Sequence, residues 1–421
     1  KVIILLVTLG RGSLASYKDF LPFHFVWYMI NFALGRKPTN HICSNFLWRR
    51  KVKKTLFVLI SVLVLSAILL SACATPTAAP TAAPTEAPVV TEAPTTAPTE
   101  APTPEPPTPT PVPDPVCTLM QNPPTVTPGG LGSPENPIVI AFVPSGDTGK
   151  ITKAGQGIAD CLNKMTGLSF KIEVGTSMAA SIEAMGAEKA QVGFLNTFSA
   201  LLANAKYPGI TPALVNLRKY TPGGDVDPDK DLAGQMEPFY KAEFIAGVDT
   251  GINSLEDVKG KKFCFVDANS TSGYVVPNIL FKAAGIDPEV DFTYQFAGGH
   301  DKVAIAVYNG DCDAGVAYTD ILTDESADLK STYPDITEKV KIFAVSERIP
   351  NDGVQFIASL DPTYKAAIIQ GLHAMTDDPG GKYLLKSLYS INDYIDVEPD
   401  YYQPFLQILV AAGVDPAELV K

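Results

Sequence analysis

Hydrophobic and polar positions alternate in two recurring ways from about residue 136 to the end of the chain. Short apolar runs, such as residues 137–145 and 191–196, predict buried strands, whereas residues 150–167 carry apolar side chains at helical spacing. Strands and helices that follow one another in this order form an open α/β sheet with mostly parallel strands.

This alternation occurs twice, so we predict an α/β fold of two lobes with mostly parallel sheets. The chain would cross between the lobes twice, near residues 242–250 and again near residues 344–350. Ligands of such sheets bind beyond the carboxyl ends of the strands, and here also between the lobes. The predicted boundaries are residues 136–245 and 346–421 for lobe 1 and residues 246–345 for lobe 2.

The segment before the lobes carries an export signal. Residues 51–72 combine a basic start, an apolar middle and a small-residue end, which is the layout of a signal peptide. The sequence LSAC that ends at Cys73 resembles the lipobox of bacterial lipoproteins, so Cys73 is the predicted lipidation site, with a transmembrane anchor as the alternative. Residues 1–50 precede this signal and are interpreted as untranslated upstream sequence, with a further membrane helix as the alternative.

Residues 73–116 are predicted to form a disordered linker. They are rich in Pro, Thr and Ala and contain no aromatic residue, so they cannot bury a core. Frequent prolines favour an extended polyproline II conformation, which suits a spacer between a lipid anchor and a folded head.

The exported part of the chain is strongly acidic. The whole sequence has a formal net charge of −12, but residues 1–72 hold ten basic residues and one acid, which leaves 23 basic against 44 acidic residues beyond them. This balance argues against nucleic acid as a partner and limits membrane contact to the lipid anchor. A small anion remains a possible ligand, because a local pocket decides its binding.

Four cysteines remain in the exported part besides Cys73. In an exported protein they can form two disulfides, with three possible pairings. Proximity along the sequence favours the pairs Cys117–Cys161 and Cys264–Cys312. Neither pair has the C-x-x-C spacing of zinc or redox sites, and we predict no metal and no cofactor.

Residues 264–277, CFVDANSTSGYVVP, place three hydroxyls and a glycine between a predicted strand and a predicted helix. The first amides of a helix have no partners within it, and its dipole leaves partial positive charge there. Ser270, Thr271 and Ser272 would add donors, and Gly273 would let a ligand approach the backbone, so the pattern predicts an anion site. The alternative is an ordinary N-cap with the other hydroxyls in solvent.

The segment around this motif, residues 260–288, resembles the signature of the periplasmic phosphate-, phosphite- and phosphonate-binding proteins of ABC transporters. The similarity continues through residues 297–320 and 347–356, and residues 175–203 resemble the first lobe of the same family. The resemblance implies a two-lobed periplasmic-binding-protein fold and a monomeric, lipid-anchored receptor. Such a receptor captures a phosphorus oxyanion and delivers it to an ABC permease and its ATPase.

The resemblance also implies the residues that grip the ligand. Ser270, Thr271 and Ser272 would bind its oxygens, and His300 would be a further oxygen partner unless it is only a surface turn residue. Asp352 matches a pocket acid at the lobe crossing, with an Asx-type turn as the alternative. A carboxylate that faces an anion needs a proton between them, so a P–OH group that donates to Asp352 would select a singly protonated oxyanion.

Asp320 matches a family acid that can meet a ligand amine. Two departures from the family pattern weaken the case for an amine-bearing ligand. Position 320 holds Asp and not the longer Glu, and Met178 stands where aminophosphonate-binding relatives have an aromatic residue. Donors from the first lobe would be Thr176, Ser177 and Asn196.

Three other functions are alternatives to this one. A receptor of the same fold could bind a sulfonate or a vitamin precursor, and only its pocket would differ. A hydrolase built on Ser272 and His300 lacks support, because the sequence contains no G-x-S-x-G, H-E-x-x-H or P-loop motif. A structural surface protein on a stalk would leave the hydroxyl cluster unexplained, so we predict a binding protein and not an enzyme.

Overall fold

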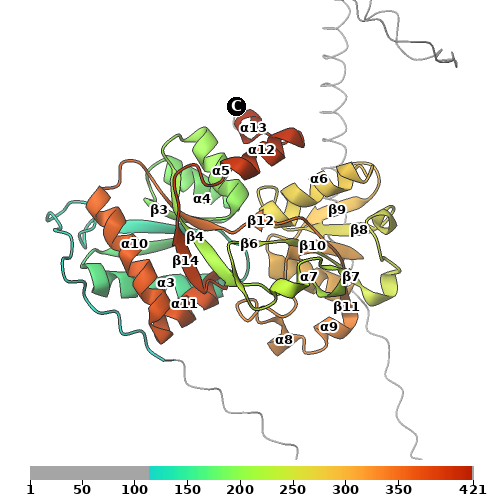
Figure 1. The fold of residues 1–421 in the computed structure, drawn as a ribbon, viewed down its shortest axis with the longest axis horizontal. Helices are drawn as coiled ribbons and strands as arrows, with labels where there is room; N and C mark the ends of the chain where they lie inside the picture. The colour runs from blue at the N-terminus through green and yellow to red at the C-terminus, as the bar shows by residue number, and fades with distance from the viewer. Residues whose placement is uncertain (1–112, 420–421) are drawn as a thin grey trace, which may run out of the picture. The chain divides into compact units, whose positions relative to one another are not determined.

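The computed structural model describes residues 113–419, which fold into two lobes that are each built on one β-sheet (Figure 1). The predicted signal peptide, Cys73, residues 1–50 and the linker up to residue 112 lie outside the described residues. Within residues 113–419 no helix combines the length and the apolar character that a membrane crossing needs.

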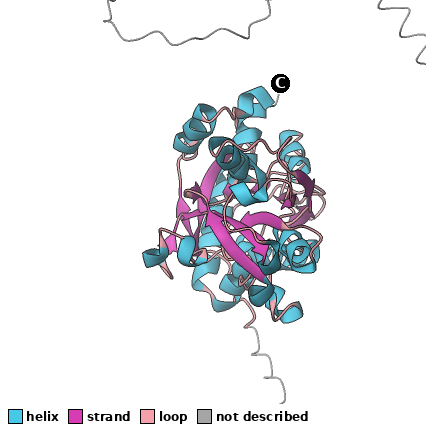
Figure 2. Ribbon diagram, turned by 90° about the vertical axis from the view of Figure 1, so that its right-hand side faces the viewer, coloured by secondary structure: helices cyan, strands magenta, loops and turns pink. Residues whose placement is uncertain are grey.

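The first lobe holds a seven-stranded sheet with the order β14-β4-β13-β3-β1-β2, and β5 pairs with β4 at one end. Strands form the inner layer and helices cover them (Figure 2). One group of helices is α3 (Thr148–Thr166), α10 (Pro362–Asp377) and α11 (Pro379–Tyr389), and another is α4 (Met178–Gly186) and α5 (Thr197–Lys206). The strands are β1 (Ile138–Phe142), β2 (Phe170–Val174), β3 (Val192–Leu195), β4 (Thr211–Lys219), β5 (Met236–Glu237), β13 (Gly353–Phe356) and β14 (Asp393–Asp396).

In the first lobe, local sequence determines where helix α3 begins and ends and how closely it packs on the sheet. Its N-cap, Asp147, accepts a hydrogen bond from the amide of Lys150 at 2.7 Å, and it ends at Gly167, whose φ of 73° favours glycine. Gly155 faces the sheet, where a Cβ atom would lie 2.8 Å from the ring of Phe142. The absence of a side chain at Gly155 therefore lets the helix pack closely on β1.

The second lobe holds a five-stranded sheet with the order β11-β7-β10-β8-β9. Rings of Phe244, Phe263, Phe265, Phe281 and Phe292 contact one another in its core. The strands are β7 (Ala242–Gly247), β8 (Lys262–Phe265), β9 (Thr293–Phe296), β10 (Ala314–Tyr318) and β11 (Val340–Val345). The helices are η3 (Val248–Thr250), η4 (Glu256–Val258), η5 (Thr271–Val275), α6 (Val276–Ala283), α7 (His300–Asn309), α8 (Leu329–Thr332) and α9 (Ile336–Lys339).

Two short antiparallel strands, β6 (Phe239–Tyr240) and β12 (Ile349–Pro350), carry the chain between the lobes. The second sheet begins with β7 at Ala242, ahead of residue 246, where the sequence analysis places the second lobe. The remaining elements are η1 (Gly224–Val226) and η2 (Lys230–Leu232) before the first crossing, and α12 (Gln403–Ala411) and α13 (Pro416–Leu419), of which α13 packs against α5.

Both sheets are mixed, so the prediction of mostly parallel sheets is wrong. In the first sheet β1 is parallel to β2 and β3, but β13 is antiparallel to β3 and β4. In the second sheet β8 is parallel to β9 and β10, but β7 is antiparallel to β10 and β11.

The physical reason for the antiparallel strands lies in the two crossings. Strands β7 and β13 are the first main strands after a crossing, so each starts at the cleft. Ala242 at the start of β7 pairs with Tyr318 at the end of β10, and Gly353 at the start of β13 pairs with Leu195 at the end of β3. A strand that begins where its neighbour ends must run opposite to that neighbour.

Each lobe carries one disulfide. Cys117 is joined to Cys161 of α3, and Cys264 of β8 is joined to Cys312 before β10. These are the two pairs that sequence proximity favours. The first one, together with a hydrogen bond from the amide of Met120 to the carbonyl of Met165, attaches the chain to lobe 1 well before residue 136.

Replacing both Cys264 and Cys312 by alanine should lower the free energy of unfolding by about 2–4 kcal/mol, because the bridge shortens the unfolded chain across a separation of 48 residues. The double alanine variant of Cys117 and Cys161, with a separation of 44 residues, is the matched comparison and should lose a similar amount. Urea denaturation of the oxidised chains measures both losses. Losses below about 1 kcal/mol in both variants would contradict a stabilising role for the bridges.

Candidate functional site

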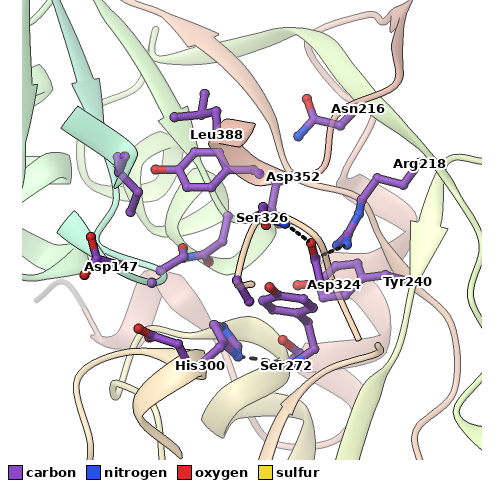
Figure 3. Close-up of a pocket in the computed structure, with 18 of the residues that line it drawn as sticks. Asp147, Asn216, Arg218, Tyr240, Ser272, His300, Asp324, Ser326, Asp352 and Leu388 are labelled. Carbon is purple, nitrogen blue, oxygen red and sulfur yellow. Dashed lines mark hydrogen bonds and ion pairs between the residues drawn. The ribbon is translucent and has the colours of Figure 1, made fainter. Parts of the chain in front are cut away.

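A cavity lies between the lobes at the ends of the strands that point toward the cleft (Figure 3). It encloses about 800 Å³ when the part that opens to solvent is counted. Lobe 1 lines it with residues at or beyond the carboxyl ends of β1, β3 and β4, and lobe 2 with residues that follow β8 and β9 or end β10. This is the position that open α/β sheets use for ligands.

The hydroxyl cluster starts a helix on the lobe 2 side of this cavity. The Oγ of Ser270 is the N-cap and accepts a hydrogen bond from the amide of Gly273 at 3.1 Å. Its carbonyl accepts the amides of Tyr274 and Val275, which begins η5 and then α6. Within the described chain the amides of Thr271 and Ser272 have no backbone or side-chain acceptor. Two unpaired N–H groups and the positive end of a helix therefore lie together.

Gly273 has a different reason to be glycine than the predicted approach of a ligand. A Cβ atom at this position would lie 2.4 Å from Cγ2 of Val266 and 2.7 Å from Oγ of Ser270. The residue is glycine because the helix packs directly on the end of strand β8.

The hydroxyl of Thr271 is used between the lobes. It accepts a hydrogen bond from the amide of Phe198 at 2.9 Å and donates to Oδ1 of Asn196 at 3.0 Å, and both partners belong to α5 or its N-cap in lobe 1. With its donor and acceptor both engaged, this hydroxyl holds the lobes together and is not free for a ligand oxygen. Ser272 lines the cavity, whereas Thr271 does not.

His300 is an uncharged donor at the start of α7. Its Nδ1 accepts a hydrogen bond from the amide of Tyr318 at 3.1 Å, so the proton of the neutral ring is on Nε2. Nε2 lies 3.4 Å from the Oγ of Ser270, and the residue lines the cavity. Burial, and then the charge of Arg218, lower the pKa of His300 to about 3.

Asp352 lies opposite this donor group, at the point where the chain re-enters lobe 1 before β13. Burial raises the pKa of Asp352 to about 7, although the amide of Thr197 donates to its Oδ1 at 3.3 Å. Tyr240 of β6 lies nearby. Burial and the charge of Asp352 raise the pKa of its hydroxyl well above the usual value, and the hydroxyl of Ser272 opposes them. Tyr240 therefore keeps its proton at every physiological pH.

Asp320 does not line this cavity. It follows β10, lies with Arg218 beside a smaller neighbouring pocket, and its amide donates to the buried carboxyl of Glu243 at 3.0 Å. Burial raises the pKa of Asp320 to about 7 and that of Glu243 to about 8, although Arg218 opposes the shift of Asp320. The acid that does line the cavity on this side is Asp324.

The structure brings together only some of the predicted lobe 1 donors. Asn196 lines the cavity, but its side chain caps α5 and accepts from Thr271. Ser177 caps α4 by accepting the amide of Ala180, and Thr176 is exposed; neither lines the cavity. Among residues 113–419 no group of three or more His, Cys, Asp or Glu side chains could hold a metal ion.

Sequence reasoning missed Arg218, Tyr240 and Asp324. Arg218 is the next-to-last residue of β4, and the position of a polar side chain at the carboxyl end of a strand was the signal that could have found it. Tyr240 belongs to a crossing strand, and Asp324 to a loop with no motif of its own. Further polar lining residues are Ser145, Asp147, Lys150, Asn216, Asp301, Tyr318, Ser326, Asn351, Ser387 and Tyr389.

Comparisons with known proteins identify relatives of this chain. A family model described as "ABC transporter, phosphonate, periplasmic substrate-binding protein" matches residues 140–402. The phosphate-import protein PhnD of Mycolicibacterium smegmatis is 32% identical over 218 residues, which is 50% of this chain and 62% of that protein. The phosphonates-binding periplasmic protein of Escherichia coli is 29% identical over 161 residues, which is 37% of this chain and 46% of that protein. The matches therefore span less than two thirds of these relatives.

Solved structures share the fold. The binding-protein component of an ABC phosphonate transporter from Pseudomonas aeruginosa aligns with a TM-score of 0.56 and 20% identity over 66% of this chain and 86% of that chain. PhnD1 from Prochlorococcus marinus, in complex with methylphosphonate, aligns with a TM-score of 0.55 and 16% identity over 66% of this chain and 98% of that chain. These likenesses confirm the predicted two-lobed α/β fold.

His300 should make the fold less stable in acid. An unfolded histidine has a pKa of about 6.5, so falling pH protonates the unfolded chain while the buried ring stays neutral until about pH 3. This group alone should cost about 2 kcal/mol of unfolding free energy between pH 7.5 and pH 5. The non-titrating variant His300→Gln should lose that part of the pH dependence. Denaturation of both chains at the two pH values measures it, and an equal change in both would contradict a buried neutral imidazole.

Proposed function

Since this chain belongs to the family of periplasmic substrate-binding proteins of phosphonate ABC transporters, we propose that it captures a small phosphorus oxyanion between its two lobes and delivers it to an importer. The family is described as one of substrate-binding proteins, which agrees with the prediction of a binding protein in place of an enzyme. The proposed cargo is phosphite, a phosphonate or phosphate.

One observation carries this proposal: the lobe 2 wall of the cavity offers hydrogen-bond donors without a fixed positive charge. The unpaired amide of Ser272, its hydroxyl and the Nε2–H of His300 line one end of it, and the unpaired amide of Thr271 precedes that of Ser272 in the first turn of the helix. A tetrahedral oxyanion presents several acceptor oxygens, which complement the hydrogen-bond donors of this wall. Hydrogen bonds to a charged group contribute about 1.5–3 kcal/mol each, so three or four of them contribute about 5–12 kcal/mol, a range that includes the roughly 8 kcal/mol of micromolar binding.

The raised pKa of Asp352 supports a ligand oxyanion that shares a proton with the protein. A bare carboxylate would repel an anion in this buried site, but a carboxyl with a pKa of about 7 can either keep its proton or accept one from a P–OH group. A sulfonate, the cargo of the alternative receptor, is fully ionised and brings no such proton. The carboxyl of Asp352 therefore favours phosphorus oxyanions over sulfonates of the same shape.

We further propose the partners and the location that the sequence implies. The receptor would be held at the outer face of the membrane by a lipid on Cys73, with residues 73–116 as a spacer. An ABC permease and its ATPase would receive the ligand from the closed monomer. The family described for residues 140–402 supports an importer as the destination.

Calorimetric titration of the purified full chain with phosphite, methylphosphonate and phosphate tests the proposal. At least one of them should bind with micromolar or tighter affinity, and Ser272→Ala should weaken it about 10- to 100-fold, because one charge-assisted hydrogen bond is lost. Ser331→Ala, an exposed serine of α8 outside the cavity, is the matched control and should bind like the parent. Methanesulfonate should bind more weakly than methylphosphonate. No binding of any of the three phosphorus compounds would refute the proposal.

The affinity for methylphosphonate should fall as the pH rises above about 8. Below pH 7 Asp352 is protonated, whereas above it both the carboxyl and the ligand lose their protons and binding has to take one up. The expected loss is up to about tenfold per pH unit. Asp352→Asn provides a permanent N–H donor, so its affinity should depend less on pH between 6 and 9. A parent and variant with the same pH profile would exclude a shared proton at this position.

A further inference from the structure

A cation that belongs to the protein already occupies the carboxylate-rich side of the cavity. Arg218 enters from β4 in lobe 1, and its Nη2 lies 3.0 Å from Oδ2 of Asp324 in lobe 2 (Figure 3). The same atom lies 3.4 Å from Oδ1 of Asp320, also in lobe 2. The guanidinium also lies 5.2 Å from the centre of the Tyr318 ring, which adds a cation–π contact. The side chain of Arg218 is 16% exposed and that of Asp324 is 2% exposed, so water screens this pair very little.

Both carboxylate oxygens of Asp324 accept hydrogen bonds from protein groups. Oδ1 of Asp324 accepts the hydroxyl of Ser390 and the amide of Ser326, both at 2.6 Å, while Oδ2 accepts Arg218. Burial works against ionisation of Asp324, but Arg218 and Ser390 keep its pKa below the usual value. Arg218 therefore supplies the positive charge that these buried carboxylates require.

On this side of the cavity, a ligand ammonium would have to use the same carboxylates. It could displace the guanidinium, which would leave Arg218 buried without its counter-charges, or lie beside it, which would place two positive charges together at low dielectric. Both arrangements are unfavourable, so the ion pairs of Arg218 work against an amine-bearing ligand on this side of the cavity.

The other acids of the lining differ in what they could offer an ammonium. The carboxylate of Asp147 accepts the amide of Lys150 as the N-cap of α3. Burial raises the pKa of Asp301, and its Oδ1 is buried without a hydrogen-bond partner among the described residues. Apolar side chains also line the cavity and suit an alkyl substituent. They are Ile151, Met178, Ala327 and Leu388.

We propose that Arg218 is a specificity-determining residue that takes the place of a ligand ammonium, so that the receptor selects phosphorus oxyanions without an amine over aminoalkylphosphonates. This inference rests on the proposed function, because it concerns the substituent on a phosphorus oxyanion that the lobe 2 donors hold.

Matched ligand pairs test the proposal on the purified full chain. Propylphosphonate and 2-aminoethylphosphonate have the same heavy-atom skeleton and differ only in a terminal methyl or ammonium group; ethylphosphonate and aminomethylphosphonate form a shorter pair. Calorimetry should show at least tenfold tighter binding of the alkyl member in whichever pair binds. Equal affinity, or tighter binding of the amine, would overturn the proposal, and the parent chain alone gives this answer.

Variants test whether Arg218 causes the preference for the alkyl ligand. Arg218→Met removes the charge and keeps an apolar side chain, so Asp320 and Asp324 become free to accept an ammonium. The ratio of alkyl to amine affinity should fall at least tenfold in this variant. Arg348→Met is the matched control: it removes an arginine whose ion pair with Asp229 lies outside the cavity, and it should leave the ratio unchanged. An unchanged ratio in Arg218→Met would overturn the assignment to Arg218.

The experiment separates failure of this inference from failure of the proposed function. A chain that binds phosphite or an alkylphosphonate but prefers the amine of each pair refutes the role of Arg218 and leaves the oxyanion site intact. A chain that binds no phosphite, phosphate or phosphonate of any kind refutes both.

Discussion

The pairing of two short strands, β6 with β12, is the constraint on which the rest of the molecule depends. Because the chain enters and leaves lobe 2 side by side at one place, β7 and β13 must both start at the cleft, and their neighbours β10 and β3 must both end there. The carboxyl ends of the parallel strands of two sheets therefore face each other. The loops that follow these ends carry the polar side chains of the cavity, so the site is a direct consequence of the two crossings.

In the cavity, the neutral hydrogen-bond donors lie in lobe 2, apart from the ion pairs of Arg218. The lobe 2 wall of amides, hydroxyl and imidazole is neutral, since burial keeps the pKa of His300 at about 3. The guanidinium of Arg218, which enters the cavity from lobe 1, is already paired with Asp320 and Asp324. Under the proposed function, an anion would therefore be bound by dipoles that lose no counter-ion when it arrives, and a proton at Asp352 would balance its charge in place of a free cation. Neutral donors prepared in advance suit a receptor that must also release its ligand.

How far the sequence could predict this molecule depends on the range of the interactions involved. The helix start at Ser270 and the position of His300 follow from short motifs, because capping and strand–helix order are local. The role of Thr271 could not be read in the same way, since its hydroxyl is defined by Asn196 and the amide of Phe198 in the other lobe. No sequence motif marks Arg218, and only the fold brings Asp324 to it. Strand direction was mispredicted because hydrophobic patterns report burial and not the edge at which a strand begins.

The contacts that hold the two lobes together differ from those proposed to select the ligand. Several hydrogen bonds cross the cleft without any ligand, among them those of Thr271 and the bond from the amide of His300 to the carbonyl of Ser145. A ligand shifts the balance between open and closed lobes only by the difference in its binding free energy to the two states. The donors at Thr271, Ser272 and His300 are all in lobe 2 and are present before closure. Contacts from lobe 1, chiefly Asp352 and Arg218, form only when the lobes meet. Under the proposed function, lobe 2 would therefore bind the oxyanion first, and Asp352 and Arg218 of lobe 1 would discriminate its protonation and its substituent as the cleft closes.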